Sequence, residues 1–230
     1  MFADYRRDRP HALERTSSAS GDVVEFRVHF ERYEVVLSVK HVSVRLVSDE
    51  GGSGVDVSEW NKKKRPYLVV GTGWYVNEEG GATSGEAAQA ATGIHQGAQT
   101  GAISMVSQLG PYVLAAVGSK LIVYEFKSEQ LIGCAFYDAQ MYIVTLSVVK
   151  DFVMYGDVYK SVHFLRWRGR CRGELVLLAK DYEPLAVSAT EFSVFEKKLA
   201  LLAVDMDENL HVMQFARRIS SLAVASVCCA

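Results

Sequence analysis

Hydrophobic residues recur at every second position over short stretches of this chain, and this alternation predicts β-strands. In the segment 150–167, KDFVMYGDVYKSVHFLRW, Phe152 and Met154 share one face of an extended chain, and Val162 and Phe164 share one face of the next run. Successive side chains of a strand point to opposite faces, which is the reason for this assignment. A glycine and an aspartate separate the two runs, as turn residues do. The segment therefore predicts two strands and a turn rather than a reaction site.

This pattern of strand, turn and strand recurs along the chain. The four copies begin at Pro66, Pro111, Asp151 and Lys198, and their first large apolar residues are separated by steps of 45, 40 and 47 residues. A period of about 40 to 50 residues built from strands is typical of a β-propeller with four strands per blade. Further strands are expected in the apolar runs at 131–137, 142–149, 174–179 and 185–195. We therefore predict an all-β fold, a partial β-propeller of about three to four blades of four antiparallel strands.

Three parts of the chain depart from this pattern. Residues 1–24 are charged and serine-rich, and we expect a disordered arm there. Residues 78–101 are rich in Gly, Ala, Thr and Gln without an apolar face, which predicts a low-complexity loop within a propeller at 25–217. Residues 218–230 are expected to form a tail. Because closed propellers have about four to eight blades, we expect part of a larger or incomplete propeller with open strand edges.

Composition and charge limit the function classes. The chain has 230 residues, of which 49% are hydrophobic and 23% charged, and its formal net charge is −2. This composition is that of a globular protein, and it lacks the strong basic excess that is usual in nucleic-acid binders. Four cysteines without C-x-x-C pairs favour a reducing compartment over a disulfide framework or a zinc ribbon. With no secretion signal and no run of about 18 apolar residues, we expect a soluble intracellular protein without membrane contact.

Motifs that resemble catalytic or cofactor sites fit structural roles better. Ser147 and Lys150 match Ser-x-x-Lys, but they fall on strand ends and the companion motifs of that chemistry are absent. The run 71–73, GTG, lacks the third glycine and the helix of a phosphate loop, and a turn is the favoured interpretation. The run 205–209, DMDEN, lacks the glycine of a calcium loop, so a polar hairpin turn is favoured. Six histidines form no H-E-x-x-H or close pair, and we predict no catalytic residue, cofactor or metal.

Two basic clusters remain. The run 62–65, KKKR, fits either a nuclear import signal or a solvated loop. The second cluster surrounds a predicted hairpin tip and comprises Arg166, Trp167, Arg168, Arg170 and Arg172. Guanidinium groups suit phosphate, and an aromatic ring can stack on a base. These five residues are therefore candidates for contact with RNA or a partner, with a charged, soluble turn as the alternative.

Four segments together resemble a known family. They are YLVVGTGWYVNEE at 67–79, LIGCAFYDAQMYI at 131–143, FVMYGDVYKSVHFLRW at 152–167 and AKDYEPLAVSATEF at 179–192. They resemble the C-terminal propeller region shared by the largest subunit of the cleavage and polyadenylation specificity factor, the large subunit of damaged-DNA-binding protein and the propeller subunit of splicing factor 3b. The resemblance is strongest to the first of these, and the order and spacing of the segments agree.

The resemblance implies a function. It implies a nuclear, non-enzymatic scaffold of the pre-mRNA 3′-end cleavage and polyadenylation complex, which organises protein subunits and supports pre-mRNA binding. The implied partners are the WD-repeat and zinc-finger subunits of the polyadenylation machinery, with pre-mRNA contacted indirectly. The alternatives are a propeller adaptor of a ubiquitin ligase in DNA repair and a spliceosomal propeller subunit. A propeller enzyme, the rival from another class, would need Asp, Glu or His residues that converge at the central channel.

Overall fold

The chain folds into β-sheets that stand side by side. The computed structural model describes residues 13–17, 24–28, 34–45, 64–74, 101–127, 130–169, 173–195, 198–216 and 221–227. Every helix or strand assigned within these ranges is a strand, so the described fold is all-β, as predicted. None of the described residues forms a helix with the length and apolarity needed to cross a membrane.

One four-stranded sheet and one eight-stranded sheet form the three blades of a partial propeller, and the eight-stranded sheet divides into two antiparallel groups of four successive strands. Blade 1 consists of β5 (Ile103–Leu109), β6 (Tyr112–Val117), β7 (Lys120–Lys127) and β8 (Gln130–Asp138). Blade 2 consists of β9 (Ile143–Val149), β10 (Phe152–Asp157), β11 (Val162–Arg168) and β12 (Glu174–Lys180). Blade 3 consists of β13 (Val187–Phe195), β14 (Lys198–Asp205), β15 (Leu210–Ala216) and β16 (Ser221–Val227). A single parallel pair between Lys180 and Ser221 links blades 2 and 3 at their outer strands.

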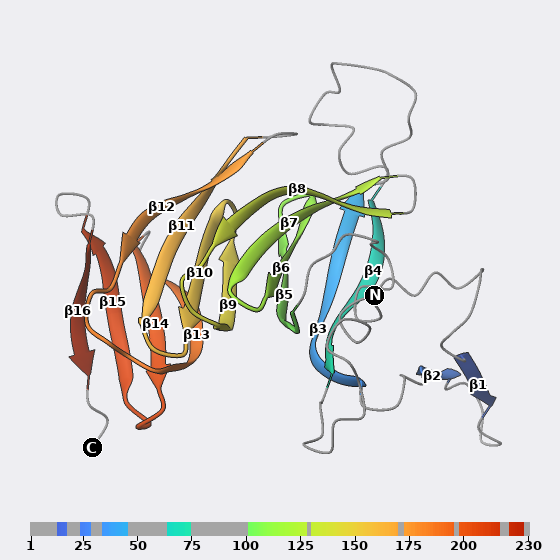
Figure 1. Cartoon of the computed structure of the whole chain (residues 1–230), viewed down its shortest axis with the longest axis horizontal. Coiled ribbons are helices and arrows are strands. Elements are labelled where there is room, and N and C mark those ends of the chain that lie inside the picture. Colours follow the sequence, from blue (N-terminus) through green and yellow to red (C-terminus); the bar gives the residue numbers. More distant parts are fainter. Residues whose placement is uncertain are drawn as a thin grey trace.

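Two shorter sheets precede the blades. The strands β3 (Glu34–Arg45) and β4 (Lys64–Trp74) pair antiparallel, and both contact β5 (Figure 1). The strands β1 (Leu13–Ser17) and β2 (Val24–Val28) pair with each other. Three complete blades and one two-stranded sheet against them agree with the predicted three to four blades. Figure 1 shows these sheets following one another in chain order from β3 to β16.

The strand boundaries differ from two expectations at the ends of the chain. Residues 13–17, within the expected disordered arm, form β1. Residues 221–227, within the expected tail, form β16, which pairs with β15 over seven residues and completes blade 3. Its sequence, SLAVASV, is apolar enough to serve as the outer strand of a blade. Of the predicted loop at 78–101, only residue 101 lies within the described residues.

Alternation along each strand divides its side chains between two cores. The core between blades 1 and 2 comprises Tyr112, Leu114, Ala116, Leu121 and Val123 from blade 1 with Val153, Tyr155, Leu165 and Trp167 from blade 2. The core between blades 2 and 3 comprises Met154, Val162 and Phe164 from blade 2 with Leu201, Ala203 and Met213 from blade 3. Phe152 and Met154 thus share one face of β10, and Val162 and Phe164 share one face of β11, as the alternation predicted. Each such buried side chain contributes roughly 1.5–3 kcal/mol relative to an exposed one.

The first strands of the blades lie against one another and are joined by hydrogen bonds. β5 contacts β9, and β9 contacts β13. Thr145 of β9 and Thr190 of β13 place their hydroxyls 3.0 Å apart. The hydroxyl of Ser147 donates to the carbonyl oxygen of Thr190 at 2.7 Å. These buried polar contacts fix blade 3 on blade 2 in one register, because a shift would leave the hydroxyls unpaired.

The face of blade 3 that points away from blade 2 has the same pattern of apolar residues as a face packed against another blade. Gly156 pairs with Val162 in blade 2, and Val204 pairs with Leu210 in blade 3. Gly156 and Val204 therefore occupy equivalent positions in the two blades, as do Val162 and Leu210. The equivalents of buried Met154 and Phe164 in blade 3 are then Leu202 and Val212, which are apolar but only half-buried. The residues of this face are Ala200, Leu202, Val204, Leu210 and Val212. Blade 3 is therefore the open end of the described stack.

Gly156 lies at the contact between blades 2 and 3, and its replacement tests the packing there. A Cβ atom on Gly156 would lie 2.6 Å from Cγ1 of Val187 and 2.8 Å from Cγ2 of Thr145, whereas one on Gly133 would meet nothing closer than 3.9 Å. We expect Gly156→Ala to lower the free energy of unfolding by about 1–3 kcal/mol, since it overpacks the interface. Gly133→Ala, on β8, is the control and should change it by less than about 0.5 kcal/mol. Urea denaturation measures both, and equal effects would contradict the interface described here.

Candidate functional site

Two of the candidate RNA-contact residues are exposed on β11. They are Arg166 and Arg168. The guanidinium of Arg166 lies 5.5 Å from the centre of the Phe152 ring, a cation–π contact worth about 0.5–1 kcal/mol at an exposed site. Arg170 and Arg172 lie outside the described residues. The described arginines thus present charge to solvent at the end of β11 that leads towards β12.

The tryptophan of the same cluster does not fit the predicted role. Trp167 is only 6% exposed, and its ring packs edge-on against Tyr112 with centroids 5.4 Å apart. Gly173 lies so close to the ring that an added Cβ would overlap it. Trp167 therefore belongs to the core between blades 1 and 2, and its ring is not available to stack on a base. The expectation that it contacts RNA is wrong for this reason.

The Ser-x-x-Lys motif is not assembled into a dyad. Ser147 is buried and donates to Thr190, whereas Lys150 is exposed in the turn after β9 with a φ of 56°. A serine nucleophile needs a base within hydrogen-bond reach, and this serine has a carbonyl oxygen there instead. The motif therefore serves the contact between blades 2 and 3.

The run 71–73, GTG, forms neither a phosphate loop nor the turn that we predicted. It lies inside β4. A Cβ atom on Gly71 would come within 2.8 Å of the carbonyl oxygen of Ile103, so glycine is needed where β5 passes close to β4. Of the basic run 62–65, Lys64 and Arg65 begin β4, and Lys62 and Lys63 lie outside the described residues.

A backbone hydrogen bond recurs at the same place in all three blades. In each blade, the first residue after the second strand donates its N–H to the carbonyl oxygen of the residue just before the first strand. The pairs are Gly118 to Ala102 at 3.1 Å, Val158 to Tyr142 at 3.2 Å and Met206 to Ala186 at 3.0 Å. These turns and the connections between blades share one face, since successive antiparallel strands reverse direction. We call this face, with its turns at 118–119, 158–161 and 206–209 and its connections at 139–142 and 181–186, the connection face.

An aspartate and a histidine six residues apart close the turn of blade 3. Oδ1 of Asp205 accepts hydrogen bonds from the backbone N–H groups of Asp207 at 2.9 Å and Asn209 at 2.8 Å. Nε2 of His211 donates to Oδ2 of Asp205 at 2.8 Å. The bond from His211, followed by those from Asn209 and Asp207, lowers the pKa of Asp205 to about 2. The predicted polar hairpin turn at this position is confirmed.

The corresponding pair in blade 2 does not close. Oδ1 of Asp157 accepts from the backbone N–H groups of Tyr159, at 2.9 Å, and Lys160. Its Oδ2 lies 3.8 Å from Nδ1 of His163, beyond hydrogen-bond length, and both atoms are buried without a hydrogen-bond partner. The His163 ring stacks on Tyr155 with centroids 4.6 Å apart, and burial lowers the pKa of His163. His163 is thus held as a neutral ring in a polar site that is not fully satisfied.

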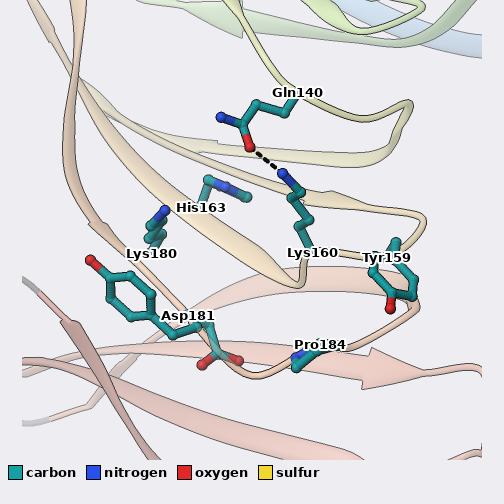
Figure 2. A pocket seen from close by; sticks show the side chains of 8 residues that line it. Gln140, Tyr159, Lys160, His163, Lys180, Asp181 and Pro184 are labelled. Atoms are coloured by element: carbon teal, nitrogen blue, oxygen red, sulfur yellow. Dashed lines mark hydrogen bonds between the residues drawn. The ribbon is translucent and has the colours of Figure 1, made fainter.

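A pocket of about 250 Å³ opens beside His163 on the connection face (Figure 2). Its lining comes from the connection before β9, the turn between β10 and β11, β11 itself, and the end of β12 with the connection that follows. The lining residues are Gln140, Tyr159, Lys160, His163, Lys180, Asp181, Tyr182 and Pro184. The sequence alone did not predict this pocket, although the repeated spacing of Asp and His in DVYKSVH and DMDENLH marked the turns.

The charges in this pocket are unbalanced. The ammonium group of Lys160 donates to the side-chain oxygen of Gln140, and that of Lys180 lies 4.8 Å from the ring centre of Tyr182. Neither lysine forms an ion pair with a carboxylate of the described residues. Asp181 also lines the pocket, and its Oδ2 accepts from the hydroxyl of Ser161 at 2.7 Å, so the lining sets two lysine charges against one carboxylate. The pocket can therefore attract an anion, and it presents no nucleophile with an adjacent base.

The described residues offer no cluster of metal ligands. Within the part of the chain that the structure describes, no three or more His, Cys, Asp or Glu side chains gather closely enough to hold a metal ion. The two Asp–His pairs lie in different blades, and their carboxylates are occupied by backbone N–H groups. Their chemistry is that of turn stabilisation.

Comparison with known proteins gives a consistent set of relatives. The family model described as "CPSF A subunit region" matches residues 13–223. The "Probable cleavage and polyadenylation specificity factor subunit 1" of Oryza sativa is 34% identical over 165 residues, which cover 67% of this chain and 11% of that protein. The "Cleavage and polyadenylation specificity factor subunit 1" of Arabidopsis thaliana is 40% identical over 117 residues, covering 50% and 8%. "Protein cft1" of Schizosaccharomyces pombe is 25% identical over 203 residues, covering 81% and 13%.

The acid-base behaviour of blade 3 can be tested. The pKa of Asp205 is about 2 in the folded chain against an ordinary value of 3.8, so the unfolded chain binds more protons between these values. Stability should therefore fall as the pH drops from about 4 to about 2, and Asp205→Asn should reduce this fall while lowering stability at neutral pH. Asp138→Asn, an exposed carboxylate on β8, is the control and should retain the wild-type profile. Urea denaturation across this pH range measures the free energy of unfolding. An unchanged slope of this free energy against pH in Asp205→Asn would refute the lowered pKa of Asp205.

Proposed function

The chain belongs to the CPSF A subunit region family, and on this premise we propose that it acts in the cleavage and polyadenylation of pre-mRNA as a non-catalytic module. The match of the family model to residues 13–223 carries the proposal, because it includes all three blades. The relatives named above bear the names of polyadenylation factors, which favours this role over the ubiquitin-ligase and spliceosomal alternatives. The chain spans only about a tenth of their length, so it corresponds to one region of such a protein.

The geometry of the blades suits a module that binds other proteins. Paired first strands, shared cores and the repeated backbone bond make the connection face rigid. A rigid surface loses little conformational entropy on binding, which favours a scaffold. In the described residues, Ser147 is buried and donates to a carbonyl oxygen, His211 is bonded to Asp205, and Lys150 is exposed in a turn. These features support a role without chemistry.

The finer parts of the proposal concern partners and place. We propose that the module helps to organise the WD-repeat and zinc-finger subunits of the polyadenylation machinery in the nucleus. Pre-mRNA is contacted indirectly in this proposal, through those subunits. The burial of Trp167 supports this, because it removes the one aromatic ring of the arginine cluster from contact with bases.

Co-purification tests the function. The chain, tagged and expressed in cells, should be recovered from nuclear extract with subunits of the polyadenylation machinery. Recovery with a cullin or with U2-associated proteins instead would overturn the proposal and indicate one of the two alternatives. Leu165→Asp is the control, since it buries a charge in the core between blades 1 and 2 and should abolish folding and recovery together.

A second experiment tests the indirect contact with RNA. Arg168→Glu combined with Arg170→Glu reverses two charges of the arginine cluster. We expect the yield of crosslinks from this chain to RNA in the assembled complex to stay within about twofold of wild type, since other subunits hold the RNA. Lys120→Glu, exposed on the connection face, is the control. A selective loss with the arginine variant would show direct contact and contradict this part of the proposal.

A further inference from the structure

The pocket beside His163 has a chemistry that the proposed function leaves unassigned. We propose that it binds the carboxylate side chain of an acidic, extended segment of a protein partner. This inference rests on the proposed function, in which the partner is a subunit of the same complex. It adds which surface of the module is used and which chemistry it recognises.

Uncompensated positive charge is the first argument. Lys160 lies in the turn between β10 and β11 and Lys180 is the last residue of β12, and no carboxylate of a described residue pairs with either. Figure 2 shows both side chains beside His163, and the carboxylate of Asp181, which also lines the pocket, accepts from Ser161. A partner carboxylate that enters would form charge-assisted hydrogen bonds, which are shorter and stronger than neutral ones. It would replace the amide oxygen of Gln140 as the acceptor for Lys160.

The rigidity of the turn that carries Lys160 is the second argument. The N–H of Ser161 donates to the carbonyl oxygen of Leu185 at 3.1 Å, and the N–H of Leu185 donates to that of Tyr159 at 3.1 Å. Ser161 has a φ of 76° and donates its hydroxyl to Asp181, so the turn is held in a conformation that few non-glycine residues adopt. The lysine thus stands on a backbone that is fixed on both sides. A partner gains from this arrangement, since little order must be created when it binds.

The surroundings of the pocket favour a protein over a nucleic acid. Tyr159 and Tyr182 are 59% and 68% exposed beside it, and Met206, on the next turn of the connection face, is 71% exposed. Tyrosine and methionine are enriched at protein interfaces.

The size of the pocket agrees with a side chain as its occupant. Its volume of about 250 Å³ lies below the range of about 300–1,000 Å³ that is usual for small-molecule sites. The flanking tyrosine rings extend the surface beyond the pocket, where they can cover apolar neighbours of the bound carboxylate. An extended peptide presents its side chains in this way, with alternate residues facing the surface.

The test places a photo-crosslinking amino acid at Tyr159 in the full chain within the assembled complex. Mass spectrometry then identifies the crosslinked segment. We expect a protein segment with Asp or Glu at or beside the crosslinked residue. Crosslinks to RNA, to a second copy of this chain, or to a segment without acidic residues would overturn the proposal.

Charge reversal completes the test. Lys160→Glu with Lys180→Glu should lower the yield of this crosslink by about tenfold or more, because two charge-assisted contacts become repulsive. The matched control is Lys150→Glu with Lys198→Glu, two exposed lysines on the opposite face, which should leave the yield unchanged. Equal effects of the two double variants would refute the proposal that this pocket binds the acidic segment.

Co-purification of the complex separates the two proposals. If the chain is recovered with polyadenylation subunits but its pocket captures no acidic segment, the pocket proposal fails and the proposed function stands. If a charge-dependent acidic segment is captured from a protein outside that machinery, the proposed function fails and the chemistry of the pocket stands.

Discussion

The need to bury both faces of each blade governs this structure. A strand in the middle of a blade sends alternate side chains to opposite sides, so Val153 and Met154, adjacent in sequence, belong to different cores. A four-stranded sheet alone would leave both of these faces in water, at a cost of roughly 1.5–3 kcal/mol for each large apolar residue. Neighbouring blades remove that cost, and they determine how far apart the first strands and their turns can lie.

The same stacking creates the connection face. Each turn between the second and third strands is bonded to the connection that enters its own blade, so the turns have little freedom. The Asp–His pair closes at 2.8 Å in blade 3 but remains at 3.8 Å in blade 2, where the connection from blade 1 and the connection to blade 3 both meet the turn. The pocket lies at this meeting point. Packing between blades has therefore produced this pocket as well as stability.

Family membership and geometry contribute different parts of the functional account. Membership in the CPSF A subunit region family relates the chain to polyadenylation factors, and the blades supply the rigid surface on which the proposed role as a scaffold rests. The geometry alone draws attention to Lys160 and Lys180, which no motif in the sequence connects. Lys160 lies in the turn before β11 and Lys180 at the end of β12, and the fold brings the two charges to one pocket.

The sequence by itself determined the all-β class, the repeat of strands and the face on which Met154 and Phe164 lie, because these follow from a two-residue period that is local to each strand. It misjudged Trp167, since flanking arginines suggest an exposed tip while burial depends on Tyr112, contributed by blade 1. It misjudged the glycines at 71 and 73, since side chains of β3 and the start of β5 pass too close to β4 there for a Cβ atom. Tertiary structure alone decided these points and the pocket, because each arises from side chains of separate segments whose distance no local pattern encodes.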